Sequence, residues 1–435
     1  MITKTFKKLA FMLTGLVLIL SSCVNDDKNL YEPKDDVPTN TEDLVVPEGF
    51  DWKMTHNITL STKSPCETTA SIFLDEECTS LLAQLPVQEG ESQMTLEVPS
   101  TNSAIWIKYP TSEGEKSMKA SINKAVTRAG AASWTANTLF PDGTKQEGGY
   151  LGVVYQPAEN KFGTIMFEDM WPEKGDNDFN DFVVNYNMVA KNDGNGYIVA
   201  TITLKLRAMG GSYPYRLCIQ LFGTAVDNDN NPVQGPEIYK EDVEITSTET
   251  ENIDNASAEL LDAKRAIIAL TGFEKLRTST GGQYYNTEKG HLISSNNATP
   301  TIKIKLKIKS ERNGVSLYSN QFAFDYFLQR TDNNREIHIS GYKPTELYKN
   351  YQQDLAGRTE KPYYCSSDRF VWALKAPEEM SWPIEKQDII EVYPKFAQWV
   401  TSGGNMIEDG VNSIKWYSDK YLTDNKNIYI DHNSH

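Results

Sequence analysis

Short runs of alternating apolar and polar residues dominate the chain from residue 46 onward. The clearest run is 301–309, in which Ile302, Ile304 and Ile308 alternate with lysines. A period of two places alternate side chains on opposite faces of an extended strand, with the apolar set facing a core. The pattern therefore predicts a mainly β fold.

The predicted strands fall into two groups, separated by a polar stretch at 111–130. The first group predicts a small N-terminal β-sandwich at 46–126, and the second predicts a larger, jelly-roll-like β-sandwich at 132–435 with few short helices. The first group comprises 58–61, 70–74, 94–98 and 104–108, and the second comprises 163–167, 182–190, 197–207, 217–223, 266–271, 301–309, 322–329 and 335–339.

Three segments depart from simple alternation. Residues 74–85 interrupt the first group, which predicts a helical turn or an insertion. Residues 191–196, with the sequence KNDGNG, predict a tight hairpin because Asn, Asp and Gly tolerate positive φ. Residues 385–400 predict one helix, because Ile389, Val392 and Phe396 recur near the helical period.

The first residues carry the pattern of an export signal. Lysines at 4, 7 and 8 precede the apolar run 9–20, which is too short to span a bilayer comfortably. Residues 1–22 are therefore predicted to be a cleaved signal peptide. The run ends at Leu20-Ser21-Ser22-Cys23, which resembles the lipobox of bacterial lipoproteins and predicts acylation of Cys23.

The segment behind the lipid anchor predicts where the protein resides. Residues 23–45 are acidic, contain proline and have few apolar side chains, so we expect a flexible stalk. Its Asn25-Asp26-Asp27 resembles the export signal of surface lipoproteins in Bacteroides-type bacteria. We therefore expect an outer-membrane lipoprotein exposed at the cell surface.

Charge and cysteine usage exclude several protein classes. Removing residues 1–22 removes three lysines and no acidic residue, which takes the formal net charge from −16 to −19. Such a charge disfavours nucleic acid as a partner. Five cysteines without a CxxC pair predict neither a disulfide scaffold nor a zinc site.

The densest candidate chemistry lies in the stretch FEDMWPEKGDNDFNDFVVNYN, residues 167–187. Asp176, Asp178 and Asn180 match the first three ligand positions of an EF-hand loop, in which alternate oxygens turn toward one hard cation. The match then ends, because Asp181 stands where an EF-hand has glycine and Asn187 stands where it has a bidentate Glu.

The remaining ligands must therefore come from elsewhere. Asp181 itself, together with Glu168 and Asp169 at the end of the preceding strand, supplies the nearest carboxylates. The sequence predicts a Ca²⁺ site made of these residues, and the alternative is a solvated turn whose side chains cap backbone groups. A second D-x-D-x-N run at 227–231 favours an ordinary polar loop, since proline follows it.

The long acidic motif is similar to the signature of the LruC-domain family of Bacteroidetes outer-membrane lipoproteins, a domain of unknown function. The segments 335–338, 341–345 and 393–399 also resemble that family, and the resemblance runs from about Phe140 to near Trp416. It implies a β-sandwich, and similar exported domains with a D-x-D-x-N-D loop are proposed to bind calcium. It implies no enzyme activity.

Other candidate residues carry weaker patterns. Tyr213 and Tyr215 follow two glycines in a loop and could stack on a sugar, as could Trp171, Trp382, Trp416 and Tyr417, although burial in a core is the commoner role of such rings. Glu336 and His338 share one face of a strand, which suits a metal, a general base or a structural hydrogen bond.

Two hypotheses about function follow. The sequence contains no GxSxG, HExxH, P-loop or GxGxxG motif. The first hypothesis is therefore a non-enzymatic, calcium-ordered surface protein that serves adhesion, matrix contact or glycan binding, with a glycan or a surface protein as its partner. The second is a calcium-dependent hydrolase of polysaccharide or cell envelope. A cleft with two facing carboxylates at glycosidase separation would favour the second.

Overall fold

The computed structural model describes residues 38–126, 132–145, 151–226, 232–293, 299–309, 322–408, 411–412 and 414–434. The predicted signal peptide, Cys23 and the second acidic loop at 227–231 lie outside these residues.

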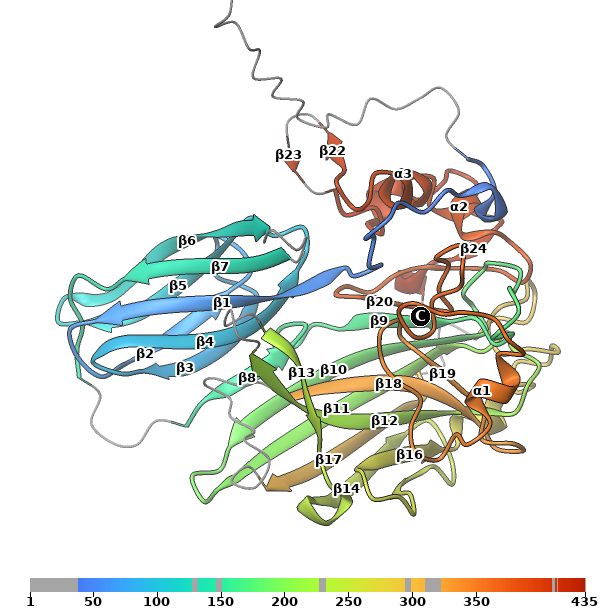
Figure 1. Ribbon diagram of the computed structural model, residues 1–435, viewed down its shortest axis with the longest axis horizontal. Coiled ribbons are helices and arrows are strands. Elements are labelled where there is room, and N and C mark those ends of the chain that lie inside the picture. The colour runs from blue at the N-terminus through green and yellow to red at the C-terminus, as the bar shows by residue number, and fades with distance from the viewer. Residues whose placement is uncertain are drawn as a thin grey trace, which may run out of the picture.

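The N-terminal unit consists of seven strands, drawn in blue to teal in Figure 1. They are β1 (Thr55–Ser64), β2 (Thr68–Phe73), β3 (Leu81–Val87), β4 (Gly90–Pro99), β5 (Ala104–Thr111), β6 (Gly114–Val126) and β7 (Ala132–Leu139).

The C-terminal unit contains the remaining strands. They are β8 (Val153–Gln156), β9 (Gly163–Phe167), β10 (Phe182–Asn192), β11 (Tyr197–Ala208), β12 (Tyr215–Val226), β13 (Pro232–Glu237), β14 (Val243–Glu251), β15 (Ser257–Leu260), β16 (Ile267–Thr271), β17 (Thr301–Lys309), β18 (Phe322–Arg330), β19 (Glu336–His338), β20 (Ala373–Ala376), β21 (Trp382–Pro383), β22 (Ile407–Glu408), β23 (Val411–Asn412) and β24 (Tyr429–Ile430).

Helices in the described residues are short. The α-helices are α1 (Tyr351–Asp354), α2 (Ile389–Val392) and α3 (Lys395–Thr401), and the 3₁₀ turns are η1 (Thr41–Asp43), η2 (Lys240–Asp242), η3 (Phe273–Leu276), η4 (Asp419–Tyr421) and η5 (His432–Ser434). Within the described ranges, no helix is both long enough and apolar enough to cross a membrane.

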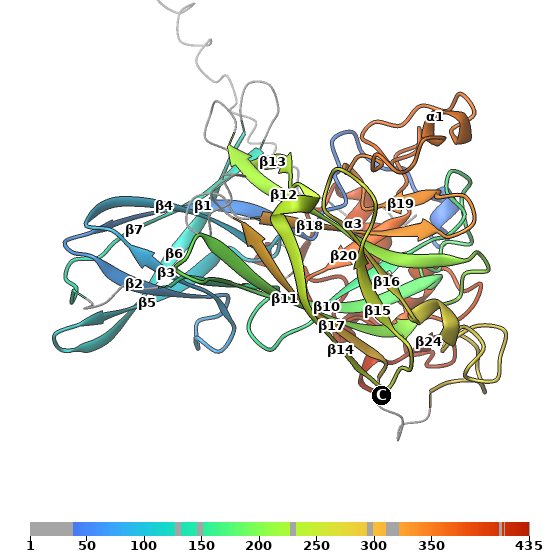
Figure 2. The same ribbon diagram turned by 90° about the horizontal axis from the view of Figure 1, so that it is seen from below.

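Two sheets form the body of the C-terminal unit. One contains the neighbours β14-β17-β11-β10, with β8, β9 and β20 beyond β10, and the other has the order β15-β16-β12-β18-β19 (Figure 1, Figure 2). Side chains from both sheets, such as Ile304 and Ile219, belong to one buried apolar cluster. The predicted mainly β sandwich fold is confirmed.

The two units share one continuous sheet. β3 of the N-terminal unit pairs with β8, and β8 pairs with β10, so hydrogen bonds run across the junction. β7 pairs with β1 and β6, which places residues 132–139 with the N-terminal unit. The boundary predicted between 126 and 132 therefore falls between two paired strands, and the chain changes unit after β7.

A C-terminal layer, residues 377–434, covers the face of β9 and β10 opposite the second sheet. Met166 and Val183 point into an apolar cluster with Phe396 and Trp399 of this layer, whereas Ile165 and Val184 point into the main core. Both faces of these strands are therefore buried, which explains their nearly continuous apolar sequence.

The chain before β1 also packs on this layer. Val46, Trp52 and Met54 join the same apolar cluster, and Thr41 donates its backbone N–H to Asp388 Oδ2 at 2.8 Å. Residues 38–54 therefore form a docked N-terminal strap, so residues 38–45, which the sequence predicted as part of a flexible stalk, pack on the C-terminal layer instead.

Two predicted elements were wrong. Residues 81–87 form strand β3, because Leu82, Ala83 and Leu85 are buried against β2 and β8. The helix predicted at 385–400 is broken into α2 and α3, with Pro394 as the residue before α3. Proline lacks the N–H that a continuous helix would need at this point.

Candidate metal centre

The acidic loop, residues 168–181, connects two paired strands of the large sheet. Its ends are fixed by the antiparallel pairing of Phe167 with Phe182. Two aromatic side chains of the loop are fully buried, Trp171 in the main core and Phe179 in the cluster of the C-terminal layer. These anchors hold the polar residues between them in one arrangement.

Three carboxylates meet at the centre of this loop. Oxygen atoms of Glu168, Asp176 and Asp178 all lie within 4.8 Å of one another. Oxygens that bind one Ca²⁺ at 2.3–2.6 Å are separated by at most about 5 Å. Glu168 and Asp178 are each 1% exposed, whereas Asp176 is exposed, so the group opens toward solvent on one side.

Hydrogen bonds fix Asp178 and Asn180 in the loop. Asp178 Oδ1 accepts from the backbone N–H of Asn180 at 3.0 Å, and its Oδ2 accepts from Asn180 Nδ2 at 2.8 Å. Asp178 Oδ2 also accepts the backbone N–H of Lys386 at 2.9 Å, and Asn180 Nδ2 donates to the Pro383 carbonyl at 3.1 Å. The loop is therefore tied to the C-terminal layer.

Three buried oxygens in this region have no hydrogen-bond partner among the described residues. They are Glu168 Oε2, Asn180 Oδ1 and Glu385 Oε1. An unsatisfied buried oxygen costs about 1–3 kcal/mol, and more for a charged group, so three together call for an explanation. A bound cation is one kind of partner that such oxygens accept.

Glycines allow these oxygens to approach the backbone. A Cβ placed at Gly175 would lie 1.7 Å from Glu168 Oε2. A Cβ at Gly210 would lie 2.1 Å from Asn180 Oδ1 and 2.4 Å from Glu385 Oε1. Both positions therefore require glycine for lack of space.

Asp169 and Asp181 lie beside this group and contact each other. The backbone N–H of Asp169 donates to Asp181 Oδ2 at 2.7 Å. Asp169 Oδ2 accepts from the Tyr213 backbone at 3.3 Å and would lie 2.5 Å from a Cβ at Gly211. Neither residue belongs to the three carboxylates whose oxygens lie within 4.8 Å of one another, and Asp169 is hydrogen-bonded to the neighbouring loop, so their role as ligands stays a prediction.

The electrostatics of the region show a concentration of negative charge. Burial, followed by the charges of Asp176 and Asp169, raises the pKa of Glu168 to about 8. Burial, then Glu168 and Asp176, raises the pKa of Asp178 well above its usual range, and Asp181 is shifted in the same direction by burial and Glu168. These shifts mean that the loop lacks enough positive charge from the protein itself.

Glu385 belongs to this region although the sequence did not predict it. Burial and, to a smaller degree, the charges of Asp176 and Glu288 raise its pKa to about 7. Residue 385 lies more than 200 positions after the loop, in a segment predicted as helix, so neither spacing nor pattern relates it to Asp178. Only the fold brings them together.

The second candidate site, the pair Glu336 and His338, belongs to a buried cluster in the core. His338 Nδ1 lies 2.5 Å from Asp325 Oδ2, and His338 Nε2 lies 3.1 Å from Glu336 Oε2. Glu336 also accepts from the Thr345 N–H at 2.7 Å and hydroxyl at 2.6 Å. All three charged side chains are 0% exposed, which favours the structural role over contact with a substrate.

The aromatic residues proposed for sugar stacking are not available as flat exposed rings. Tyr215 is 3% exposed and donates its hydroxyl to the Asp169 carbonyl at 3.2 Å. Tyr213 is half-buried, and the guanidinium of Arg330 lies over its ring at 4.1 Å. The other four candidates, Trp171, Trp382, Trp416 and Tyr417, are buried in the core. The prediction of a sugar site at Tyr213 and Tyr215 was wrong.

Comparison with known proteins gives the chain a family. Residues 196–417 match the family described as "Domain of unknown function (DUF4842)". The chain belongs to this DUF4842 family. The matched segment includes Glu385 and the strands β11–β20, whereas the acidic loop lies just before it. The match does not carry the LruC name, so the narrower resemblance stays a prediction.

One solved structure has a similar fold. It is the crystal structure of a "Putative lipoprotein from Bacteroides ovatus", with a TM-score of 0.59 and 20% sequence identity, covering 84% of this chain and 99% of that one. At this identity the similarity concerns the fold alone. No curated protein matches the DUF4842 chain.

Proposed function

We propose that this protein is a lipid-anchored, non-enzymatic binding protein of the outer cell surface, whose C-terminal unit is stabilised by bound Ca²⁺. The metal proposal depends on three buried oxygens without a hydrogen-bond partner in the described part of the chain, which belong to Glu168, Asn180 and Glu385. They lie in the region of the clustered carboxylates. Ca²⁺ accepts six to eight oxygen ligands in irregular geometry, whereas Mg²⁺ demands a near-ideal octahedron.

The residues that would hold the ion come from two distant parts of the chain. Glu168, Asp176, Asp178 and Asn180 belong to the acidic loop, and Glu385 belongs to the C-terminal layer. An ion shared between them would join the layer to the sheet, in addition to the hydrogen bond from the Lys386 backbone to Asp178. Its proposed role is therefore structural.

The metal proposal is tested by the stability of residues 38–435 in excess Ca²⁺ and in excess chelator. An ion at about a hundred times its Kd adds about 2.7 kcal/mol to the free energy of unfolding. We expect Asp178→Ala to abolish this increment. Asp193→Ala, which removes a turn-capping carboxylate in the β10–β11 hairpin, should lower stability equally in both conditions.

Two outcomes would contradict the metal proposal. One is an equal loss of stability for Asp178→Ala in calcium and in chelator, which would make the residue purely structural. The other is no calcium effect on the wild type together with no metal in elemental analysis of the purified protein. Elemental analysis separates this case from an ion that the chelator fails to remove.

The anchor proposal rests on the Leu20–Cys23 pattern and on the lipoprotein named in the structural comparison. A single residue that carries several acyl chains binds a membrane far more firmly than one chain does. We expect wild-type protein to fractionate with membranes and Cys23→Ala to become soluble. A Cys23→Ala protein that still fractionates with membranes would refute acylation as the anchor.

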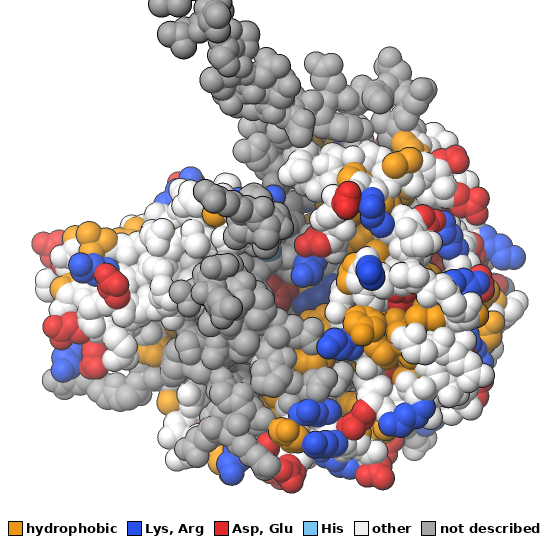
Figure 3. Space-filling model, in the orientation of Figure 1, with side chains coloured by type: hydrophobic (Ala, Val, Ile, Leu, Met, Phe, Trp, Pro, Cys, Tyr) orange, Lys and Arg blue, Asp and Glu red, His pale blue; other side chains and the backbone are white. Residues whose placement is uncertain are grey.

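We propose binding over hydrolysis because the closely spaced carboxylates of the described residues, apart from the exposed Asp176, are enclosed. Glu168 and Asp169 are 1% and 5% exposed, and Asp325, Glu336 and His338 are fully buried. Substrate cannot reach these groups in this conformation. On the face seen in Figure 3, acidic and basic side chains are interspersed over the C-terminal unit. This face therefore has no large patch of one charge that would attract a highly charged polymer.

A further inference from the structure

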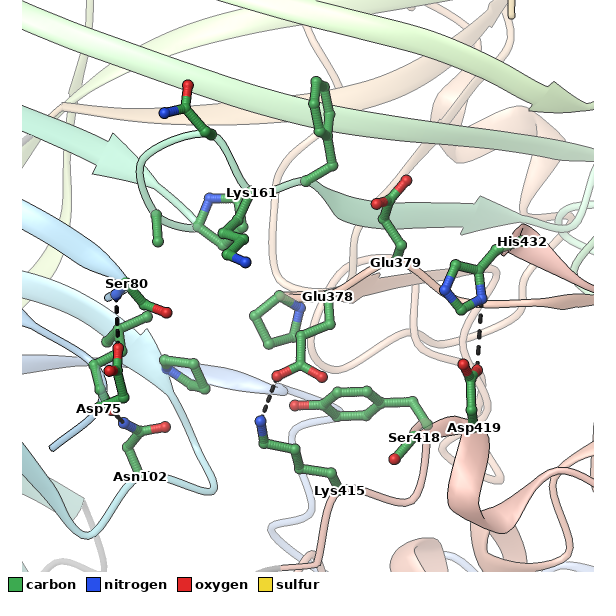
Figure 4. A pocket seen from close by; sticks show the side chains of 18 residues that line it. Asp75, Ser80, Asn102, Lys161, Glu378, Glu379, Lys415, Ser418, Asp419 and His432 are labelled. Atoms are coloured by element: carbon green, nitrogen blue, oxygen red, sulfur yellow. Dashed lines mark hydrogen bonds and ion pairs between the residues drawn. The ribbon is translucent and has the colours of Figure 1, made fainter. Parts of the chain in front are cut away.

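A polar cavity of about 580 Å³ lies between the N-terminal unit and the C-terminal layer (Figure 4). Its walls come from the β2–β3, β4–β5 and β8–β9 turns and from the C-terminal layer at 377–379, 415–419 and 432. This volume falls within the range of about 300–1,000 Å³ that is typical of small-molecule sites.

Side-chain hydrogen bonds hold the turns that form the walls. Asp75 accepts the backbone N–H of Thr79 at 2.8 Å and of Ser80 at 2.7 Å, which fixes the β2–β3 turn. Asn102 Nδ2 donates to the Leu74 carbonyl at 2.8 Å and joins the β4–β5 turn to it.

The β8–β9 turn is held in the same way. Asn187 of β10 is 8% exposed, and its Nδ2 donates to the carbonyls of Ala158 at 3.2 Å and Lys161 at 2.7 Å. Walls that are already ordered reduce the entropy lost when a ligand binds.

The two units that enclose the cavity are rigidly joined. β3 and β8 are paired through Ala83–Val154 and Gln84–Val153. Close by, Lys375 Nζ of the C-terminal unit lies 3.1 Å from Glu97 Oε1 of the N-terminal unit. The cavity is therefore a fixed feature of the fold.

Charged groups of both signs face this cavity. The ammonium of Lys161 points toward its middle in Figure 4 and has no hydrogen-bond or ion-pair partner among the described residues. Glu379 comes from the C-terminal layer, and its carboxylate makes no hydrogen bond within the described ranges. Glu378 is already paired with Lys415.

These groups select the chemical class of ligand. The lining contains four carboxylates and two lysines, a formal charge of −2 with His432 neutral, which disfavours a polyanion. Hydroxyl groups of a ligand can accept from Lys161 and donate to Glu379, and each of these hydrogen bonds would be charge-assisted. Phe162 and three prolines add apolar atoms to the lining, and the ammonium of Lys205 already lies over one face of the Phe162 ring at 3.9 Å.

We propose that this cavity binds a neutral oligosaccharide through its hydroxyl groups, with Lys161 and Glu379 as the principal polar contacts. The inference rests on the proposed non-enzymatic binding role and names its ligand class. The cavity is separate from the metal centre, since none of the carboxylates around Asp178 lines it.

The test is a titration of the full mature chain, in excess calcium, with cellobiose, lactose, maltose and N,N′-diacetylchitobiose, read by saturation-transfer NMR and calorimetry. We expect at least one of these sugars to bind. Lys161→Ala and Glu379→Gln should each weaken that binding by about ten-fold, the loss of one charge-assisted hydrogen bond. Lys63→Ala, which changes an exposed lysine of β1 outside the lining, should bind as wild type.

Three outcomes would overturn the inference. The first is no binding of any of the four sugars, and the second is binding that both cavity variants leave unchanged. The third is cleavage of the bound sugar, which would assign a hydrolase. Calcium-dependent stability is measured separately, so a failure of the metal proposal and a failure of the sugar proposal are distinguishable.

Discussion

Two clusters of buried carboxylates in the C-terminal unit differ in how their negative charge is compensated. The Asp325–Glu336–His338 cluster contains its own cation, because burial alone would lower the pKa of His338, whereas Asp325 and Glu336 together raise it to about 9. Among the described residues, the acidic loop around Glu168 and Asp178 has no cation in an equivalent place. Burial raises the pKa values of its carboxylates, as it raises the pKa of Asp325 to about 6.

The difference shows what distinguishes a structural cluster from a site that needs a ligand. In the first cluster Glu336 accepts hydrogen bonds from Thr345 and His338, both imidazole nitrogens have partners, and one buried oxygen, Asp325 Oδ1, has no partner among the described residues. In the acidic loop, Glu168 Oε2 and Asn180 Oδ1 have none. Acidic residue density and an unpartnered oxygen are common to the two clusters, whereas a histidine that can carry a positive charge is found within the first.

The largest expected effect comes from a change in the Asp325–Glu336–His338 cluster. Glu336→Ala leaves His338 with one carboxylate and leaves Thr345 without its acceptors, so we expect a loss of about 3–5 kcal/mol in the free energy of unfolding. The loss should be the same in calcium and in chelator, measured by denaturant titration. Glu251→Ala, at an exposed end of β14, should change stability by less than about 0.5 kcal/mol. A loss confined to calcium would contradict the distinction between the clusters.

A smaller effect tests whether Glu385 completes the acidic loop. Glu385→Gln keeps the shape of the side chain but removes its charge, so we expect calcium affinity to fall about ten-fold, equivalent to about 1.4 kcal/mol. Calorimetric titration of calcium measures this change. The control is Glu391→Gln, an exposed acid of α2 in the same layer, whose affinity should be unchanged. Equal affinities for the two variants would remove Glu385 from the site.

Local patterns predicted most strands, and tertiary contacts explain the exceptions. β9 and β17 have the predicted bounds, and the KNDGNG hairpin joins β10 to β11 as expected. The sequence did not predict β3, because the side chains of β3 are buried by pairing with β2 and β8 and their apolar alternation is weak. The single helix at 385–400 failed because its apolar spacing continued across Pro394, whose missing N–H ends the hydrogen-bond series.

The candidate site was only partly predictable for a similar reason. Asp176, Asp178 and Glu168 lie within one short stretch, so sequence spacing could group them. Glu385 and the close glycine Gly210 come from other segments, and no local pattern marks them. Tyr215 was misassigned because a loop position suggested exposure, whereas its hydroxyl is bound to the Asp169 carbonyl inside the fold.

The smallest expected effect is the change with pH in the free energy of unfolding that His338 causes. The pKa of His338 is about 9 in the folded state, against about 6.5 for an unperturbed histidine. Between these values the folded protein holds a proton that the unfolded chain has released, so stability is fully present below pH 6.5 and falls as pH rises through 9. From pH 7 to 8 the expected loss is about 1 kcal/mol.

The measurement is made in excess calcium, which we expect to keep the carboxylates of the acidic loop ionised, so that they do not add to the change of stability with pH. His338→Gln should then show a shallower fall over the same range, because glutamine does not titrate. Tyr364 contacts the imidazole, but burial raises its pKa well above this range. An identical slope in wild type and His338→Gln would mean that the imidazole is neutral, and the cluster would then lack the internal cation that sets it apart from the acidic loop.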